Sequence, residues 1–260
     1  MGNIELKRVI PVLSIIDNKL VKTIKFKNPN YIGDPINAVK IFNDKEVDEV
    51  ILQDIRATVA GGKPNYDKIE EICSEAFMPF AYGGAIQSME QVDTLFKVGI
   101  EKVVLNSVLS QDINLVRLIK EKYGAQSIVS SIDVKKGVFS SYQVYSHSGR
   151  KKIKDSLIDY VKAIVEAGVG EILLNSIDRD GTFKGFDLEL IKTISSLSRV
   201  PVIASGGARN LDDFKFAFQN GASAVAAGSM FVYRGEQRGI LINYPSQLDL
   251  KTKSLLKPEI

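Results

Sequence analysis

Residues 79–107, PFAYGGAIQSMEQVDTLFKVGIEKVVLNS, and residues 201–229, PVIASGGARNLDDFKFAFQNGASAVAAGS, follow the same pattern. In each stretch a short apolar run ends in a Gly-Gly-Ala turn, an amphipathic segment follows, and a second apolar run ends in a small polar pair. A repeat between two halves of a chain favours a closed (β/α)8 barrel, the TIM barrel, over an open sheet. An open doubly wound sheet would carry a Gly-rich dinucleotide turn near its start, and this sequence has none there.

The rest of the chain continues the alternation of short apolar runs with amphipathic stretches that is typical of repeated βα units. Helices are expected at 88–98, 113–122 and 156–167, where apolar residues recur at helical spacing. The sequence therefore predicts a single α/β barrel domain over residues 1–260, with strands at Arg8–Leu13, Asp48–Asp54, Pro79–Tyr82, Lys102–Asn106, Ser127–Asp133, Glu171–Ser176, Val200–Ala204 and Ser223–Ala227.

The composition is that of a globular protein with no sign of nucleic-acid or membrane binding. The 260 residues are 45% hydrophobic and 25% charged, with a formal net charge of +3 and a pI of 8.7, too mild for a basic nucleic-acid face. Cys73 is the only cysteine, and no group of His, Cys, Asp and Glu has metal-ligand spacing. We therefore expect a cytoplasmic protein without disulfide, metal or cofactor. The apolar run at 9–16 is too short for a signal peptide or membrane span and predicts a strand.

Two sets of small residues at strand ends predict phosphate binding at the C-terminal mouth of the barrel. Gly-rich loops that lead into helix N-termini offer backbone N–H groups to phosphate oxygens. A single glycine pair suits a tight turn equally well, but two matched sets indicate a substrate with two phosphates. The first cradle comprises Gly83, Gly84, Asn106 and Ser107, and the second cradle comprises Ser205, Gly206, Gly207, Gly228 and Ser229.

Aspartates follow several of the apolar runs. Asp54, Asp133 and Asp178 each lie at or just after a predicted strand end. A carboxylate at the barrel mouth can act as a general acid or base. The alternative for a lone aspartate is a cap on the following helix or turn. The run Ser176-Ile-Asp-Arg-Asp-Gly-Thr182 is more specific than a lone cap and favours a functional loop.

Short motifs recur at the predicted strand ends over about residues 7–231: Arg8-Val-Ile-Pro11, Gly33-Asp-Pro35, Tyr82-Gly-Gly84, Ser131-Ile-Asp133, Ser176 to Thr182 and Ala204-Ser-Gly-Gly207. Together they resemble the cyclase subunit (HisF) of imidazole glycerol phosphate synthase. The resemblance implies that ammonia from a glutaminase (HisH-type) subunit crosses the barrel and attacks a bisphosphorylated ribulosyl aminoimidazole carboxamide. The products would be imidazole glycerol phosphate and an aminoimidazole carboxamide ribotide. Candidate substrate-binding residues beside the two cradles are then Lys22, Asp54, Asn175, Asp178, Asp180, Gly181 and Thr182.

The first strand departs from the family pattern. The resemblance implies two catalytic aspartates at the ends of the first and fifth strands; Asp133 matches the second, whereas Ser14 stands at the position of the first. A serine hydroxyl does not ionise usefully near pH 7, and a positioned acid or base contributes about 10²- to 10⁴-fold in rate. Asp17 could substitute, but it lies three positions on, and strand alternation points it elsewhere. The sequence therefore predicts a weakened cyclase reaction.

Four charged residues begin strands at the N-terminal end of the predicted barrel. Strand alternation places Arg8, Lys102 and Glu171 on the same side as the mouth residues of their strands, and the signs of the four charges alternate around the barrel. A solvated charge is the alternative for any one of them, but alternating signs argue for a paired cluster. In the family, a matching ring gates the ammonia path, which implies a glutaminase docked at the N-terminal face. The predicted ring comprises Arg8, Glu49, Lys102 and Glu171.

The expected first loop contains three lysines, Lys22, Lys25 and Lys27. Lys22 matches a lysine that lies over the active site in the family. The alternative is that Lys22 is simply a solvated loop residue.

The C-terminal segment, residues 232–260, departs from the closing helix of the family. Together with Ser14, it resembles cyclase-like paralogues found with lipopolysaccharide and other surface-polysaccharide genes. Those are associated with a glutaminase and a third amidotransferase protein that converts an acetamido sugar group into an acetamidino group.

Three functions are consistent with these residues. The favoured one is an ammonia-channelling subunit for sugar amidation, built on the cyclase fold. The second is an active cyclase of histidine biosynthesis, supported by both cradles, Asp133 and the charged ring, and opposed by Ser14. The third is a non-catalytic phosphate-binding scaffold for a glutaminase. A solitary isomerase of the same pathway is less well supported, because it would have no use for an ammonia gate.

Overall fold

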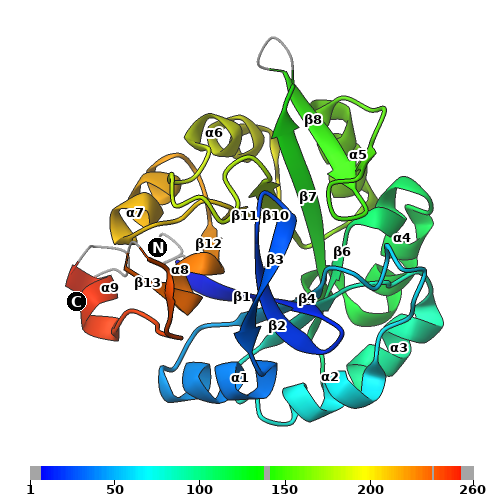
Figure 1. The fold of residues 1–260 in the computed structure, drawn as a ribbon. Helices are drawn as coiled ribbons and strands as arrows, with labels where there is room; N and C mark the ends of the chain where they lie inside the picture. Colours follow the sequence, from blue (N-terminus) through cyan, green and yellow to red (C-terminus); the bar gives the residue numbers. More distant parts are fainter. Residues whose placement is uncertain (1–6, 138–140, 236, 253–260) are drawn as a thin grey trace, which may run out of the picture.

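The computed structural model describes residues 7–137, 141–235 and 237–252. Within these ranges eight parallel strands form a ring, which pairing between the first and last of them closes (Figure 1). This confirms the predicted (β/α)8 TIM barrel, and every strand starts within two residues of its expected start. In spatial order the strands are β10 (Glu171–Ser176), β11 (Val202–Ser205), β12 (Ala224–Ala227), β1 (Arg8–Ile16), β4 (Val50–Asp54), β5 (Phe80–Gly83), β6 (Lys102–Leu105) and β7 (Ile128–Lys136).

Helices surround the barrel, and most of them begin after a residue whose side chain caps the helix. The hydroxyl oxygens of Ser88 and Ser156 accept hydrogen bonds from backbone N–H groups of α3 and α5, so both serines cap their helices rather than start them. Helix α5 ends at Gly168, whose φ of 105° is the left-handed conformation that glycine adopts without strain. The helices are α1 (Pro35–Asp44), α2 (Tyr66–Cys73), α3 (Met89–Lys97), α4 (Asn114–Tyr123), α5 (Leu157–Ala167), α6 (Leu188–Leu197), α7 (Leu211–Gln219) and the short α8 (Ser229–Val232).

Strand alternation divides the core into two apolar layers. One set of side chains points outward from the strands and packs against the helices, and it includes Val9, Leu13 and Leu52. The other set points inward and fills the barrel. Because successive residues of a strand face opposite sides, the inward set continues into the charged residues below it and the polar residues above it. The inward set comprises Ile10, Val12, Ile51, Ala81, Val104, Val129, Leu173, Ile203, Ala224 and Ala226.

Two antiparallel hairpins extend the barrel at its mouth. The segment with Lys22 and Lys27, expected as a loop, instead forms β2 (Lys19–Ile24) and β3 (Lys27–Gly33), which cross the mouth in Figure 1. The turns at 17–18 and 25–26 have positive φ at both residues, as two-residue hairpin turns require. The second hairpin lies after β7 and comprises β8 (Tyr142–Ser146) and β9 (Lys151–Lys152).

The chain after α8 packs back onto the barrel. It forms a short hairpin of β13 (Tyr233–Arg234) and β14 (Gly239–Ile240) and then α9 (Gln247–Thr252). Between them, the buried hydroxyl of Tyr244 donates to the backbone oxygen of Val9 at 2.8 Å, and its ring packs near Phe42 and Phe231. Much of the segment that departs from the family pattern is therefore continuous with the outer apolar layer.

Candidate active site at the barrel mouth

A cavity of about 610 Å³ opens at the C-terminal ends of the strands. It brings together most of the residues that the sequence singled out for the mouth, and both cradles contribute all their members. The predicted residues that line it are Ser14, Lys22, Asp54, Gly83, Gly84, Asn106, Ser107, Asp133, Asn175, Asp180, Gly181, Ser205, Gly206, Gly207, Gly228 and Ser229.

Two predicted residues are not among those that line the cavity. The Asp178 carboxylate accepts a hydrogen bond from the backbone N–H of Lys136 at 2.8 Å, which ties the loop after β10 to the end of β7. The Thr182 hydroxyl donates to the backbone oxygen of Arg179 at 2.6 Å. Both side chains thus shape the loop that presents Asp180 and Gly181, rather than facing the cavity themselves.

The cradles are built where the backbone needs glycine. Gly206 has a φ of 91°, and a Cβ there would lie 2.7 Å from the Asn175 side-chain oxygen. Ser107 begins a 3₁₀ turn and Ser229 begins α8, so backbone N–H groups without helical partners occur in both cradles. The buried hydroxyl of Ser229 has no hydrogen-bond partner in the described part of the chain. A polar atom left unpaired in a buried cradle is what an anionic ligand group would satisfy.

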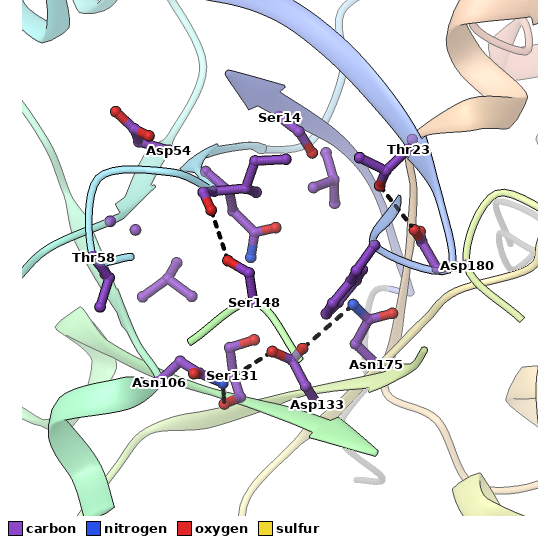
Figure 2. A pocket seen from close by; sticks show the side chains of 18 of the residues that line it. Ser14, Thr23, Asp54, Thr58, Asn106, Ser131, Asp133, Ser148, Asn175 and Asp180 are labelled. Carbon is purple, nitrogen blue, oxygen red and sulfur yellow. Dashed lines mark hydrogen bonds between the residues drawn. The ribbon is translucent and has the colours of Figure 1, made fainter. Parts of the chain in front are cut away.

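Asp133 lies on the floor of the cavity at the mouth end of β7 (Figure 2). Its two carboxylate oxygens accept hydrogen bonds from Asn106 Nδ2 at 3.2 Å and from Asn175 Nδ2 at 3.4 Å. Burial raises the pKa of Asp133 from 3.8 to about 7, although the two amide hydrogen bonds act to lower it, and the nearby Asp180 acts to raise it further. A carboxyl with this pKa can hold or release a proton near neutral pH, as an acid or base must.

Ser14 faces Asp133 from the other side of the cavity, and no carboxylate stands in for it on β1 (Figure 2). Asp17 lies in the turn after the strand, is 71% exposed, and pairs with Arg56 at 2.7 Å. Asp54 ends the neighbouring β4, where its carboxylate accepts from the backbone N–H groups of Arg56 and Ala57 and so caps the following turn. Burial raises the pKa of Asp54, and these backbone hydrogen bonds oppose the shift.

Lys22 points from β2 into the mouth instead of lying in a solvated loop. Its ammonium is 3.5 Å from the backbone oxygen of Val12, and it lies so close to Gly228 that a Cβ there would be 1.9 Å from Nζ. Burial lowers the pKa of Lys22, and the opposite charge of Asp180 acts to raise it. A buried cation next to the second cradle is suited to an anionic ligand group.

Sequence reasoning missed several residues of the mouth. Gln53 and Ser131 could have been found, because each lies two positions from another inward residue of its strand. Ser148 and Arg150 carry no such signal: they reach the cavity because the β8–β9 hairpin folds back, where the Ser148 hydroxyl donates to the backbone oxygen of Ile55 at 2.6 Å. His147 sits in the turn of this hairpin, and its backbone N–H donates to the Ser107 hydroxyl at 3.0 Å.

The four predicted ring residues meet at the opposite, N-terminal end of the barrel. Arg8 pairs with Glu49 at 2.5 Å and also with Glu171. Lys102 pairs with the same two carboxylates, at 2.9 Å and 3.1 Å. Glu49 is only 2% exposed. The alternative of separately solvated charges is therefore wrong, and every member of the ring contacts two members of opposite sign.

Comparisons with known proteins agree with this geometry. Residues 8–238 match the family model described as "Histidine biosynthesis protein". A Pseudomonas aeruginosa protein provisionally named imidazole glycerol phosphate synthase subunit hisF2 is 50% identical over 92% of this chain and 96% of its own length. A Vibrio vulnificus protein provisionally named subunit hisF3 is 45% identical over 94% of this chain and 95% of its own length. Subunit HisF of Streptococcus mutans is 36% identical over 87% and 91%, respectively.

In the described ranges, no helix is both long and apolar enough to cross a membrane.

The match over nearly the whole barrel, the two cradles and the charged ring lead to one family. This chain belongs to the family of HisF-type cyclase subunits of imidazole glycerol phosphate synthase and, within it, to the paralogous branch that includes hisF2 and hisF3.

Proposed function

We propose that this chain is the ammonia-receiving subunit of a glutamine-dependent amidotransferase complex in the cytoplasm, with its own cyclase reaction weakened. The complex would supply ammonia for amidation of an acetamido sugar in surface-polysaccharide synthesis. The observation that carries this proposal is the combination of Ser14 at the mouth, without a replacement carboxylate on β1, and a fully paired ring at the base. A chain with the complete ring at the base, but with Ser14 in place of a catalytic aspartate at the mouth, is better suited to delivering ammonia than to using it in its own cyclase reaction.

The interior of the barrel supports the delivery of ammonia. Above the ring lies the apolar inward layer, and above that layer lies the polar mouth. An apolar lining strongly disfavours a bare ammonium ion and is far less costly for neutral ammonia. A HisH-type glutaminase docked at the N-terminal face would release ammonia beside the ring, whose ion pairs would have to part for it to enter. A third amidotransferase protein would then act on the sugar.

The runner-up is an active cyclase of histidine biosynthesis. It is favoured by Asp133, whose pKa of about 7 suits proton transfer, and by the two cradles that line a single cavity with it. In this case the bisphosphorylated substrate would span the mouth between the cradles, and Asp133 alone would do the acid and base work. A non-catalytic scaffold would bind the same phosphates without turnover.

The test supplies the purified chain with an ammonium salt and bisphosphorylated ribulosyl aminoimidazole carboxamide, and measures imidazole glycerol phosphate. We expect weak turnover from the native chain and a gain of about 10² or more in Ser14→Asp, because a positioned carboxylate contributes about that much. Ser14→Ala is the matched control and should match the native chain, since the hydroxyl does not replace the acid.

Native turnover equal to that of an ordinary HisF would refute the weakened-cyclase proposal and favour the runner-up. Phosphate-ligand binding without product in both the native chain and Ser14→Asp, with stimulation of a glutaminase, would favour the scaffold. The amidation step itself needs the reconstituted complex: labelled amide nitrogen from glutamine should appear in an acetamidino sugar only when this chain is present.

A further inference from the structure

The short C-terminal hairpin reaches back to two elements of the mouth. Tyr233 on β13 is buried, and its phenolic oxygen accepts a hydrogen bond from Asn30 Nδ2 on β3 at 3.0 Å. Arg238, just before β14, donates to the backbone oxygen of Gly181 at 2.9 Å. The Arg238 guanidinium also lies over two aromatic rings, 5.0 Å from the centre of Phe183 and 5.9 Å from that of Tyr233. One arginine thus joins the C-terminal hairpin to the loop after β10.

The two elements that this hairpin contacts also contact each other. The backbone N–H of Lys25 donates to the backbone oxygen of Asp180 at 2.9 Å, and the Thr23 hydroxyl donates to the Asp180 carboxylate at 3.3 Å (Figure 2). Gly181 approaches the β2 backbone so closely that a Cβ there would lie 2.3 Å from the Thr23 oxygen. The β2–β3 hairpin, the loop after β10 and the C-terminal hairpin therefore form one packed unit beside the second cradle.

The β2–β3 hairpin has little else to hold it down on its outer side. In the described structure β3 pairs only with β2, and five of its seven residues are exposed. Strand β2 is held on its inner side by antiparallel pairing with β1, so β3 is the edge strand, and its outer side depends on contacts with other elements. The contact from Tyr233 is made at this outer strand, and the contact from Arg238 fixes the loop that the inner strand rests on.

We propose that Tyr233 and Arg238 are positioning residues: the C-terminal hairpin straps the β2–β3 hairpin and the loop after β10 over the mouth, so that Lys22 and Asp180 stay at the second cradle. This inference rests on the phosphate binding that the sequence predicts for the second cradle and that the runner-up function requires. The segment after residue 231 would then support ligand binding, because it contacts both the β2–β3 hairpin, which carries Lys22, and the loop after β10, which carries Asp180. Without the strap, the hairpin would open more often and withdraw Lys22 from the cavity.

The test compares Arg238→Ala and Tyr233→Phe with Arg234→Ala, which removes an exposed arginine of the same hairpin. Hydrogen exchange of residues 19–33 should accelerate roughly tenfold in Arg238→Ala and a few-fold in Tyr233→Phe, in line with the loss of a charged and a neutral hydrogen bond. Acetylation of the buried Lys22 amine by acetic anhydride should rise in parallel. Arg238→Lys should show slower exchange and less Lys22 acetylation than Arg238→Ala, because the lysine keeps a charged donor. Arg234→Ala should match the native chain in both measurements.

A second measurement links the strap to binding. The affinity for glycerol 3-phosphate, measured by calorimetry, should fall in the order in which Lys22 labelling rises. Unchanged exchange and labelling in Arg238→Ala would overturn the proposal, and so would acceleration spread equally over α3 and α4, because that would show general support of the barrel. If the native chain binds no glycerol 3-phosphate, the proposed phosphate site fails, whereas exchange and labelling still decide whether the strap exists.

Discussion

The two ends of the barrel differ in whether their buried charged residues are paired within this chain. At the base, each member of the ring pairs with two partners of opposite charge; although burial acts to raise the pKa of Glu171, contacts with Arg8 and Lys102 lower it. At the mouth, burial raises the pKa of Asp133 and lowers that of Lys22, so the charged forms of both are disfavoured. The base is satisfied within this chain, whereas the mouth holds charges and unpaired polar atoms that a ligand would satisfy.

The largest expected effect on stability comes from removing one carboxylate from the ring. Glu49→Gln leaves Arg8 and Lys102 sharing Glu171 alone, in a site where Glu49 is 2% exposed. Loss of one partner of a buried ion pair costs about 3 to 5 kcal/mol, and we expect urea denaturation to show a loss of that size in the free energy of unfolding. Glu71→Gln, which removes an exposed pair with Lys68, is the control and should cost at most about 0.5 kcal/mol. Similar losses in both variants would show that the ring is not the satisfied cluster described above.

The stability of the folded chain should depend on pH in opposite directions at the two ends, because the pKa of Asp133 is raised and that of Glu171 is lowered. Between about pH 4 and pH 7 the unfolded chain loses the Asp133 proton while the folded chain keeps it, so the native protein loses stability as pH rises through this window. Asp133→Asn lacks this loss, and its stability relative to the native chain should increase by about 3 kcal/mol between pH 4.5 and pH 8. Urea unfolding at several pH values measures the difference. A difference in the free energy of unfolding between Asp133→Asn and the native chain that stays constant from pH 4.5 to pH 8 would contradict an Asp133 carboxyl that is held protonated by burial.

The sequence predicted the features that repeat with the strand period. Strand alternation placed Arg8, Lys102 and Glu171 on the inward side of the barrel, where the structure has them. Ser14 and Asp133 were instead singled out by their resemblance to the family pattern. Loop geometry has no such period, which is why Asp178 and Asp180, two positions apart, could not be separated. Lys22 was assigned to a loop because its burial depends on contacts with distant residues, Asp180 among them. The contacts of Arg238 with Gly181 and Phe183 likewise depend on tertiary packing alone.

The smallest expected effect on stability comes from truncating an exposed aromatic residue at the base, Phe77. Phe77 lies in the loop before β5, at the N-terminal end of the barrel, and is 88% exposed; the Asn43 side chain fixes this loop through the Phe77 N–H at 3.0 Å and the Glu75 backbone oxygen. Phe77→Ala should change the free energy of unfolding by no more than about 0.5 kcal/mol. If a glutaminase docks on this face, an exposed aromatic is a suitable anchor, and we expect the affinity of the complex to fall about tenfold or more.

The matched control for Phe77→Ala is Phe216→Ala, an exposed aromatic on α7, away from the N-terminal loops. Calorimetric titration with the glutaminase should show a weaker complex for Phe77→Ala alone. Equal affinity for both variants would remove Phe77 from the docking face, and among the described residues the argument for a partner at the base would then rest on the ring. A loss for Phe216→Ala alone would place the partner on the helical side of the barrel, and the ring could then no longer be connected to a docked source of ammonia.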